Sequence, residues 1–208
     1  MWRAIELALG MTILILTIAA CSKASSTPLP GKTIIPTPGG EDIRKPAVAG
    51  RFYPGDTEKL SRMVEAMLAQ AQKVVEPDPI VVIAPHAGYI YSGQVAAWAF
   101  KQVEGRDYEF VVVLGVNHQT PTFDKISVYA GDAFETPLGR VPIQKEIANA
   151  LIEAHERILF DRKVHKPEHS IEVEIPFLQK VLPDVPIVPI IIGAPTEENC
   201  RILADALV

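Results

Sequence analysis

The chain has 208 residues, of which 48% are hydrophobic and 22% are charged, a balance typical of one globular domain with a buried core. Its formal net charge of -5 and its lack of Lys- and Arg-rich runs argue against nucleic-acid binding, because such binding needs a basic surface. Two cysteines, Cys21 and Cys200, are too few for a disulfide framework.

Residues 1–20 are expected to be a lipoprotein signal peptide. The apolar stretch 11–20 is shorter than the roughly 20 residues of a bilayer-spanning helix but fits a signal-peptide core. Ile18-Ala-Ala-Cys21 resembles a bacterial lipobox, in which cleavage precedes a cysteine that becomes lipid-modified. An uncleaved anchor helix that begins near Trp2 is the alternative. Both interpretations predict an extracytoplasmic, membrane-anchored protein, with the lipid anchor at Cys21 in the first case.

Residues 21–46 are rich in Pro, Gly and Ser and offer little apolar surface to bury. Such a composition is typical of a spacer without a fixed orientation. We therefore expect a tether over 21–46 and a folded domain over 47–208.

The folded part alternates between helical and strand patterns. Helices are expected at 56–72 with Asp56 or Thr57 as N-cap, at about 94–103 with Ser92-Gly93 as cap, at 143–155, and after a Thr196 cap. Strands covered on both faces are expected at 80–84, 110–114 and 185–192, and shorter strands at 127–130 and 139–143. Segment 169–182 fits a strand or a helix. We favour the helix, capped by Ser170, because it precedes a strand, although Pro176 would kink it. This alternation predicts an α/β fold.

Two histidines follow two of the predicted buried strands. His86 comes after 80–84, and His118 comes after 110–114. A right-handed crossover between these strands would place them side by side or one strand apart, so that both loops share one rim of the sheet. Imidazole is the commonest metal-binding side chain, which favours a metal site here. Two loop histidines that hydrogen-bond to carbonyl groups are the alternative, and the spacing alone names no metal.

Five motifs follow one another along the chain. They are Ala49-Gly-Arg-Phe-Tyr-Pro54, Ala84-Pro-His-Ala-Gly-Tyr-Ile-Tyr-Ser-Gly93, Leu114-Gly-Val-Asn-His118, Phe134-Glu-Thr-Pro-Leu-Gly139 and Glu168-His-Ser-Ile-Glu-Val-Glu174. Together they closely resemble the Memo family, called AmmeMemoRadiSam system protein B in bacteria and archaea, from about Lys45 to Val208. The resemblance implies an αβα sandwich with a mostly parallel or mixed sheet, similar to the class III extradiol dioxygenases. It also implies a site for iron or copper with His86 and His118 among its ligands.

The same resemblance implies that family members continue beyond the position of Val208, where an Asp-x-x-His segment and a cysteine belong to the metal site. We therefore expect the C-terminal part of the domain to be missing from this sequence. It further implies an AMMECR1-type protein and a radical-SAM protein as partners. His169 is a candidate catalytic residue, as a general acid or base or as a group that orients a ligand. A helix-start residue bonded to local backbone is the alternative.

Three functions remain open on this basis. The leading one is a metal-dependent redox protein with a non-haem iron or copper site. The others are a non-catalytic module that binds a metal or a peptide, and a metal-assisted hydrolase. Glu172 or Glu174 could supply a carboxylate ligand. Four other residues are expected to have lesser roles: Tyr89 and Tyr91 as pocket-lining or packing groups, and His155 and His165 as surface residues.

Overall fold

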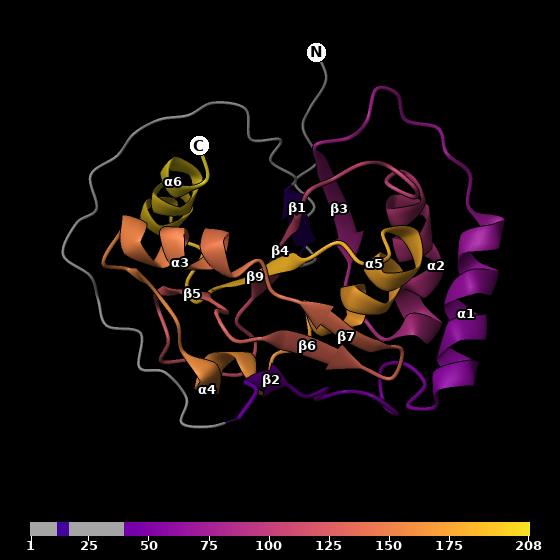
Figure 1. Cartoon of the computed structure of the whole chain (residues 1–208), viewed down its shortest axis with the longest axis horizontal. Helices are drawn as coiled ribbons and strands as arrows, with labels where there is room; N and C mark the ends of the chain where they lie inside the picture. Colours follow the sequence, from indigo (N-terminus) through magenta and orange to yellow (C-terminus); the bar gives the residue numbers. More distant parts are fainter. Residues whose placement is uncertain (1–11, 17–39) are drawn as a thin grey trace, which may run out of the picture.

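The computed structural model describes the backbone of Thr12–Leu16 and all of residues 40–208. A central six-stranded mixed sheet lies between two groups of helices, and a smaller three-stranded sheet lies below it in the view of Figure 1. This arrangement is consistent with the predicted αβα sandwich. Among the described residues, no helix has the length and apolar character needed to cross a membrane.

The six-stranded sheet has the strand order β3-β1-β4-β9-β5-β8. Its strands are β1 (Thr12–Leu16), β3 (Val81–Pro85), β4 (Val111–Val116), β5 (Ile126–Val128), β8 (Ile158–Leu159) and β9 (Ile187–Ile192). Strand β1 pairs antiparallel with both β3 and β4, and β4 pairs parallel with β9. The strands β3 and β4 therefore run in the same direction, with β1 between them. The crossover had predicted that they would be either neighbours or separated by one strand, and the second arrangement is the one observed.

Strand β1 comes from within the predicted signal peptide. Its Ile15 lies opposite Val82 on one side and Val113 on the other. Cleavage before Cys21 would remove this strand from the sheet. The remainder of the expected leader, Cys21 itself and the tether up to residue 39 lie outside the described residues.

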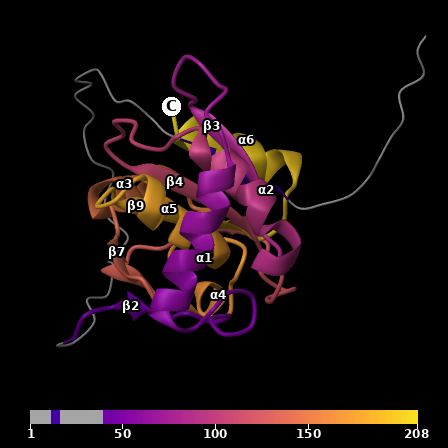
Figure 2. The same ribbon diagram turned by 90° about the vertical axis from the view of Figure 1, so that its right-hand side faces the viewer.

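Helices cover the sheet from two sides. They are α1 (Thr57–Gln70), α2 (Tyr89–Lys101), α3 (Lys145–Ala154), α4 (Arg162–His165), α5 (Ile175–Val181) and α6 (Glu197–Ala206). Helices α1, α2 and α5 pack against one another, with α1 outermost, while α3 packs on β5, β8 and β9 (Figures 1 and 2). The predicted caps of α1 and α6 are confirmed, because the Asp56 side chain accepts a hydrogen bond from the Lys59 N–H and that of Thr196 accepts one from the Asn199 N–H.

Helix α2 begins at Tyr89, earlier than predicted. Gly88 occupies the N-cap position without a side-chain hydrogen bond, and Ser92 lies inside the helix, so the predicted Ser92-Gly93 cap is wrong. The Tyr89 N–H donates instead to the carbonyl of Phe52, at 2.8 Å. A backbone carbonyl from a distant loop therefore satisfies an amide that a local cap would otherwise serve.

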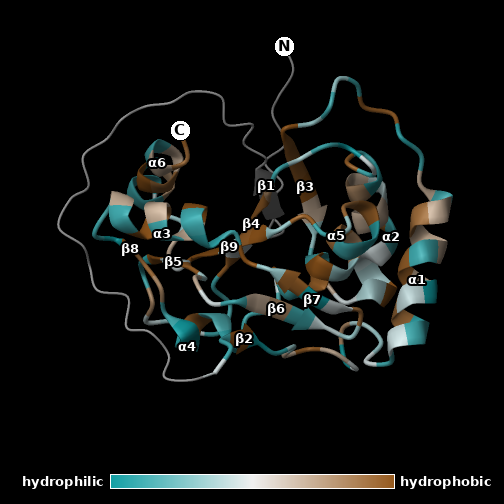
Figure 3. Cartoon of the chain, viewed as in Figure 1, coloured by the Kyte–Doolittle hydropathy of each residue, from teal (hydrophilic) through white to brown (hydrophobic). Residues whose placement is uncertain are grey.

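The prediction that three strands are covered by other parts of the protein on both faces is confirmed for β4 and β9 but is wrong for β3. Every residue of Val111–Leu114 is buried, whereas in β3 only alternate residues are buried. The side chains of Val81 and Ile83 are 40% and 60% exposed, while Val82 is 8% exposed. Helix α2 packs on β3, and the alternation of buried and exposed residues places Val81 and Ile83 on the face that it leaves uncovered; Figure 3 shows the hydrophobic character of this strand.

The smaller sheet contains β2 (Ile43–Arg44), β6 (Ala133–Thr136) and β7 (Gly139–Pro142). Strands β6 and β7 form a hairpin whose turn includes Gly139 at a φ of 120°. The pattern had predicted β7 but not β6. Strand β2 pairs with β6 and buries Arg44 to 4% exposure, so the folded structure includes residues from the end of the expected tether.

The ambiguous segment is helical, as favoured. A 3-10 turn over Glu172–Glu174 leads into α5, and Pro176 lies in the first turn of α5. Proline is tolerated there because the first N–H groups of a helix have no partner within the helix, so it introduces no kink. Ser170 is not the cap. Its Oγ accepts a hydrogen bond from the Val116 N–H at 3.1 Å and so ties this segment to β4.

Candidate metal site

His86 and His118 meet at the rim of the sheet. His86 directly follows β3, and His118 lies two residues beyond β4. Their Nε2 atoms are 3.2 Å apart, and their ring centroids are 5.4 Å apart. Two side chains that are 32 residues apart in sequence are thus brought together because both strands end at the same edge.

The separation of the two nitrogens suits a shared metal ion. Metal–imidazole bonds are roughly 2.0–2.1 Å long, so nitrogens 3.2 Å apart would subtend an angle of roughly 100° at the metal. That angle lies between octahedral and tetrahedral values. The same distance also fits a direct hydrogen bond between one protonated and one unprotonated imidazole nitrogen.

His169 forms the third ring of the cluster. It stacks on His118 with ring centroids 5.0 Å apart and an interplanar angle of 20°. The ring of Phe52 meets its other side edge-on, at 5.1 Å. Within the described part of the chain, however, no three or more His, Cys, Asp or Glu side chains are placed together so as to hold a metal ion. His169 therefore forms the wall of the site.

Burial favours the neutral form of the three imidazoles. It lowers the pKa of His86 to about 4, with a further contribution from the proximity of His118 and His169. Burial also lowers the pKa of His118 and that of His169. Neutral imidazoles at neutral pH have the lone pair that a metal requires. The Nδ1 of His86 is buried and has no hydrogen-bond partner among the described residues, although a metal-bound imidazole usually has one.

Glu172 is fully occupied by hydrogen bonds that hold the fold together. Its carboxylate accepts from the N–H groups of Ala47 and Val48, at 2.7 and 2.9 Å, and from the Tyr53 hydroxyl at 2.6 Å. It also forms a buried ion pair with Arg44. With four donors directed at its two oxygens, Glu172 is not available to a metal.

The other carboxylates of this segment are also away from the histidine pair. Glu168 accepts hydrogen bonds from the Ser170 hydroxyl and the Ile171 N–H. Glu174 is fully buried, and neither of its oxygens has a partner among the described residues. Burial raises the pKa of Glu174 well above its usual value, which disfavours its charged form. The described residues therefore provide two imidazoles but not the carboxylate of a two-His-one-carboxylate set.

Close backbone packing positions His118 and His169. A Cβ atom on Gly115 of β4 would lie 2.5 Å from Ile171 and 2.6 Å from Ser170, so only glycine lets the His169 segment approach β4 this closely. The loop after β4 is held by Asn117, whose Oδ1 accepts from the Thr120 N–H at 2.9 Å. These contacts could not be identified from the histidine spacing.

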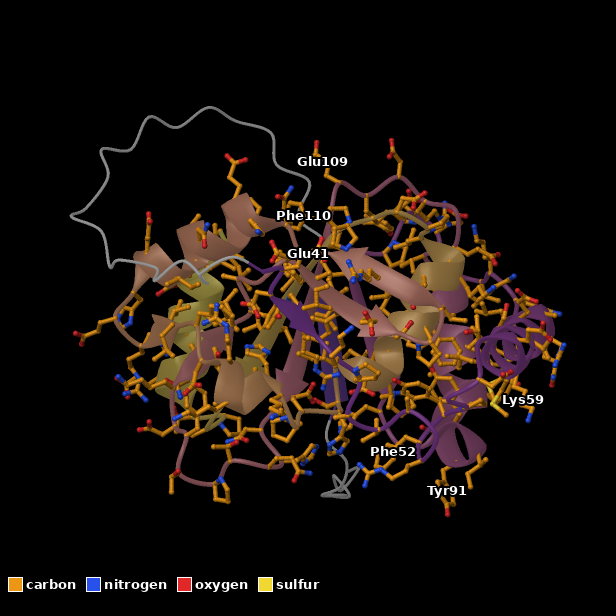
Figure 4. All side chains as sticks on the ribbon, turned by 60° about the horizontal axis from the view of Figure 1, so that its bottom comes forward. Glu41, Phe52, Lys59, Tyr91, Glu109 and Phe110 are labelled. Atoms are coloured by element: carbon orange, nitrogen blue, oxygen red, sulfur yellow. The ribbon has the colours of Figure 1, made fainter. Side chains whose placement is uncertain are left out.

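Phe52 and the tyrosines show what sequence reasoning missed. No periodicity in the sequence predicted the contact of Phe52 with His169, although Phe52 belongs to the motif Ala49-Gly-Arg-Phe-Tyr-Pro54. Tyr89 is buried and donates its hydroxyl to the Val173 carbonyl at 2.7 Å, so it packs in the core. Tyr91 is 82% exposed and points away from the body of the protein (Figure 4).

His165 is buried rather than exposed, so the prediction of a surface residue is wrong. Its Nε2 lies 3.0 Å from the Ser127 Oγ, and its ring contacts those of Tyr129 and Phe160. Burial lowers its pKa to about 3. The charged residues beside it in sequence suggested a surface position, but helix α4 turns both Val164 and His165 inward.

Comparison with known proteins places this chain in a family. A family model described as "Memo-like protein" matches residues 44–208. The chain belongs to the Memo family. Its relatives include MEMO1 family proteins from Thermoplasma volcanium (37% identical), Saccharolobus islandicus (41%) and Thermotoga petrophila (39%). Each match covers 79% of this chain but only 61%, 62% and 63% of the respective relative, so this Memo-family chain spans less than two thirds of their length.

Proposed function

We propose that this Memo-family chain supplies two imidazole ligands, from His86 and His118, to the non-haem iron or copper site of a redox protein. The observation that carries the proposal is the 3.2 Å separation of the two Nε2 atoms at the ends of β3 and β4. The lowered pKa values of both imidazoles support it, because neutral rings can bind a metal. The other ligands would be water or groups from polypeptide outside the described residues.

A bound iron or copper ion would supply redox chemistry at open positions suited to O2 or a small substrate. The chain's own residues would prepare the site. The strands hold the two imidazoles at a fixed spacing, and the ring of Phe52 shields one side of His169. The lowered pKa of His169 favours its neutral form, so this ring would be available as a general base at the rim of the site.

The decisive experiment is the metal content of the full chain, purified without oxygen. We expect iron or copper to be bound by the unaltered protein and lost in His86→Ala and in His118→Ala. His155→Ala is the matched control, since His155 lies outside the cluster and its Nδ1 accepts a hydrogen bond from the Arg157 N–H. Metal retained by both site variants, or no metal in the unaltered protein, would contradict the proposal.

The identity of the metal separates the alternatives. Iron or copper supports the redox protein, whereas zinc would favour a metal-assisted hydrolase. Tightly bound metal without turnover would favour a binding module. The variant His169→Gln should keep the metal, because its ring stacks on His118 without joining the Nε2 pair. Loss of metal in this variant would make His169 a ligand instead.

We also propose that the protein is membrane-anchored outside the cytoplasm through a lipid on Cys21. Labelling with a radioactive fatty acid should mark the unaltered protein but not Cys21→Ser.

We further propose a partnership with AMMECR1-type and radical-SAM proteins, which co-purification would test. Radical-SAM chemistry belongs in a reducing cytoplasm, so lipid-labelled protein that lies wholly outside the cytoplasm would argue against that partnership.

A further inference from the structure

A second cavity, unrelated to the histidine cluster, lies between β2 and α4. It has a volume of about 690 Å³ and is lined by the segment Asp42–Ala47, by Tyr129, and by Arg162, Lys163, Lys166 and Pro167. None of His86, His118 and His169 lines it. The Memo-family motifs described above do not account for it.

The walls of this cavity are largely apolar. Pro46, Ala47 and Pro167 contribute aliphatic surface, and Tyr129 contributes an aromatic ring. The Tyr129 hydroxyl is already bonded to the Asp42 carbonyl, at 3.1 Å. The ring is therefore fixed, and the cavity offers a preformed surface for an apolar group.

The rim of the cavity is cationic, and two of its cations lack partners. Arg44 pairs with the buried Glu172, Lys45 with the half-buried Glu135, and Arg162 with Asp42. By contrast, the ammonium groups of Lys163 and Lys166 make no hydrogen bond or ion pair with any other described residue. These two lysines are three positions apart at helix α4 and therefore face the same side.

The other large cavity provides a comparison. It has a volume of about 480 Å³, and its lining includes Arg140 and Lys180. Arg140 pairs with Glu41, and Lys180 pairs with Glu65. Its basic side chains are therefore neutralised from within the chain. Unpaired cations beside an apolar wall distinguish the cavity at α4.

We propose that the cavity between β2 and α4 binds a small amphipathic anion. Its acidic group would pair with Lys163 and Lys166, and its apolar body would lie against Pro46, Ala47 and Pro167. Lys163 in α4 and Lys166 at its C-cap carry like charges three positions apart and repel each other, and an anion relieves that repulsion while the apolar wall gains coverage. A medium-chain carboxylate has both features.

The test is titration of the full chain with monomeric decanoate by calorimetry, at low salt. We expect saturable binding that becomes at least about tenfold weaker in the double variant Lys163→Gln/Lys166→Gln. The matched control is Lys59→Gln/Lys125→Gln, which removes the same charge from exposed positions elsewhere and should bind as the unaltered chain does. Decanol, which lacks the charge, should bind at least about tenfold more weakly than decanoate.

Backbone amide NMR shifts locate the ligand and give the proposal a second readout. Decanoate should shift signals in Ile43–Ala47 and Arg162–Lys166. Shifts confined to the exposed apolar residues of α2 and β3, or equal weakening by both double variants, would overturn the proposal. Binding only to phosphatidylglycerol vesicles, with none to monomeric decanoate, would also overturn it and would indicate a membrane-facing surface.

Discussion

The buried pair of Arg44 and Glu172 gives the sharpest test of how this fold holds its site. Arg44 is 4% exposed and Glu172 is 1% exposed, so neither charge is compensated by water. In Glu172→Gln the new amide has a single acceptor oxygen, and its NH2 group must face some of the four donors that the carboxylate serves. The Arg44 charge would then be buried without its counter-ion. We expect the free energy of unfolding to fall by about 3–5 kcal/mol.

The assay is urea unfolding near neutral pH, followed by circular dichroism. Lys45→Gln is the control, because its ion pair with Glu135 is largely exposed and should contribute less than about 1 kcal/mol. Adding Arg44→Met to Glu172→Gln should cost much less than the sum of the two single substitutions, since it removes the uncompensated charge. A loss below about 1 kcal/mol in Glu172→Gln would refute the reasoning.

Two further predictions concern burial and close packing. Because burial lowers the pKa of His165 from 6.5 to about 3, the unfolded chain binds a proton between these values that the folded chain does not. The contribution of the neutral His165 to the free energy of unfolding is fully present above pH 6.5, the pKa of the unfolded chain. It should fall by about 2 kcal/mol from about pH 8 to about pH 5. Urea titrations should show a weaker pH dependence in His165→Gln, whereas Phe160→Leu should lower stability at every pH and keep the dependence. Gly115→Ala should cost about 1–3 kcal/mol, because its Cβ would overlap Ile171. Gly93→Ala should cost less in the same unfolding assay, since the two atoms nearest to its Cβ belong to the flexible end of Met67 and alanine favours the helix.

Local patterns were sufficient to predict most elements of this fold. Apolar runs of β-branched residues predicted β4 and β9, and the caps at Asp56 and Thr196 predicted where α1 and α6 begin. These patterns depend only on residues that are close in sequence, so they allow a helix or strand to be predicted without knowledge of the tertiary structure. The early start of α2 at Tyr89 was missed because a carbonyl from the distant Phe52 satisfies its first amide.

The candidate site was predictable only in part. The positions of His86 and His118 after two strands that run in the same direction predicted their shared rim, because strand ends in such a sheet meet at one edge. Their order along the chain could not give the 3.2 Å separation, the stacking of His169 on His118, or the loss of Glu172 to structural hydrogen bonds.

The sequence by itself was therefore sufficient to predict the α/β class, the family, and His86 and His118 as candidate ligands. Each of these predictions rests on a local pattern of residues or on motifs in a fixed order. The tertiary structure alone decided which side chains are buried and which are free to act. His165 became a core residue, and Lys163 and Lys166 were left as unpaired cations beside an apolar cavity. Burial and pairing depend on contacts between residues far apart in sequence, and no local pattern records those contacts.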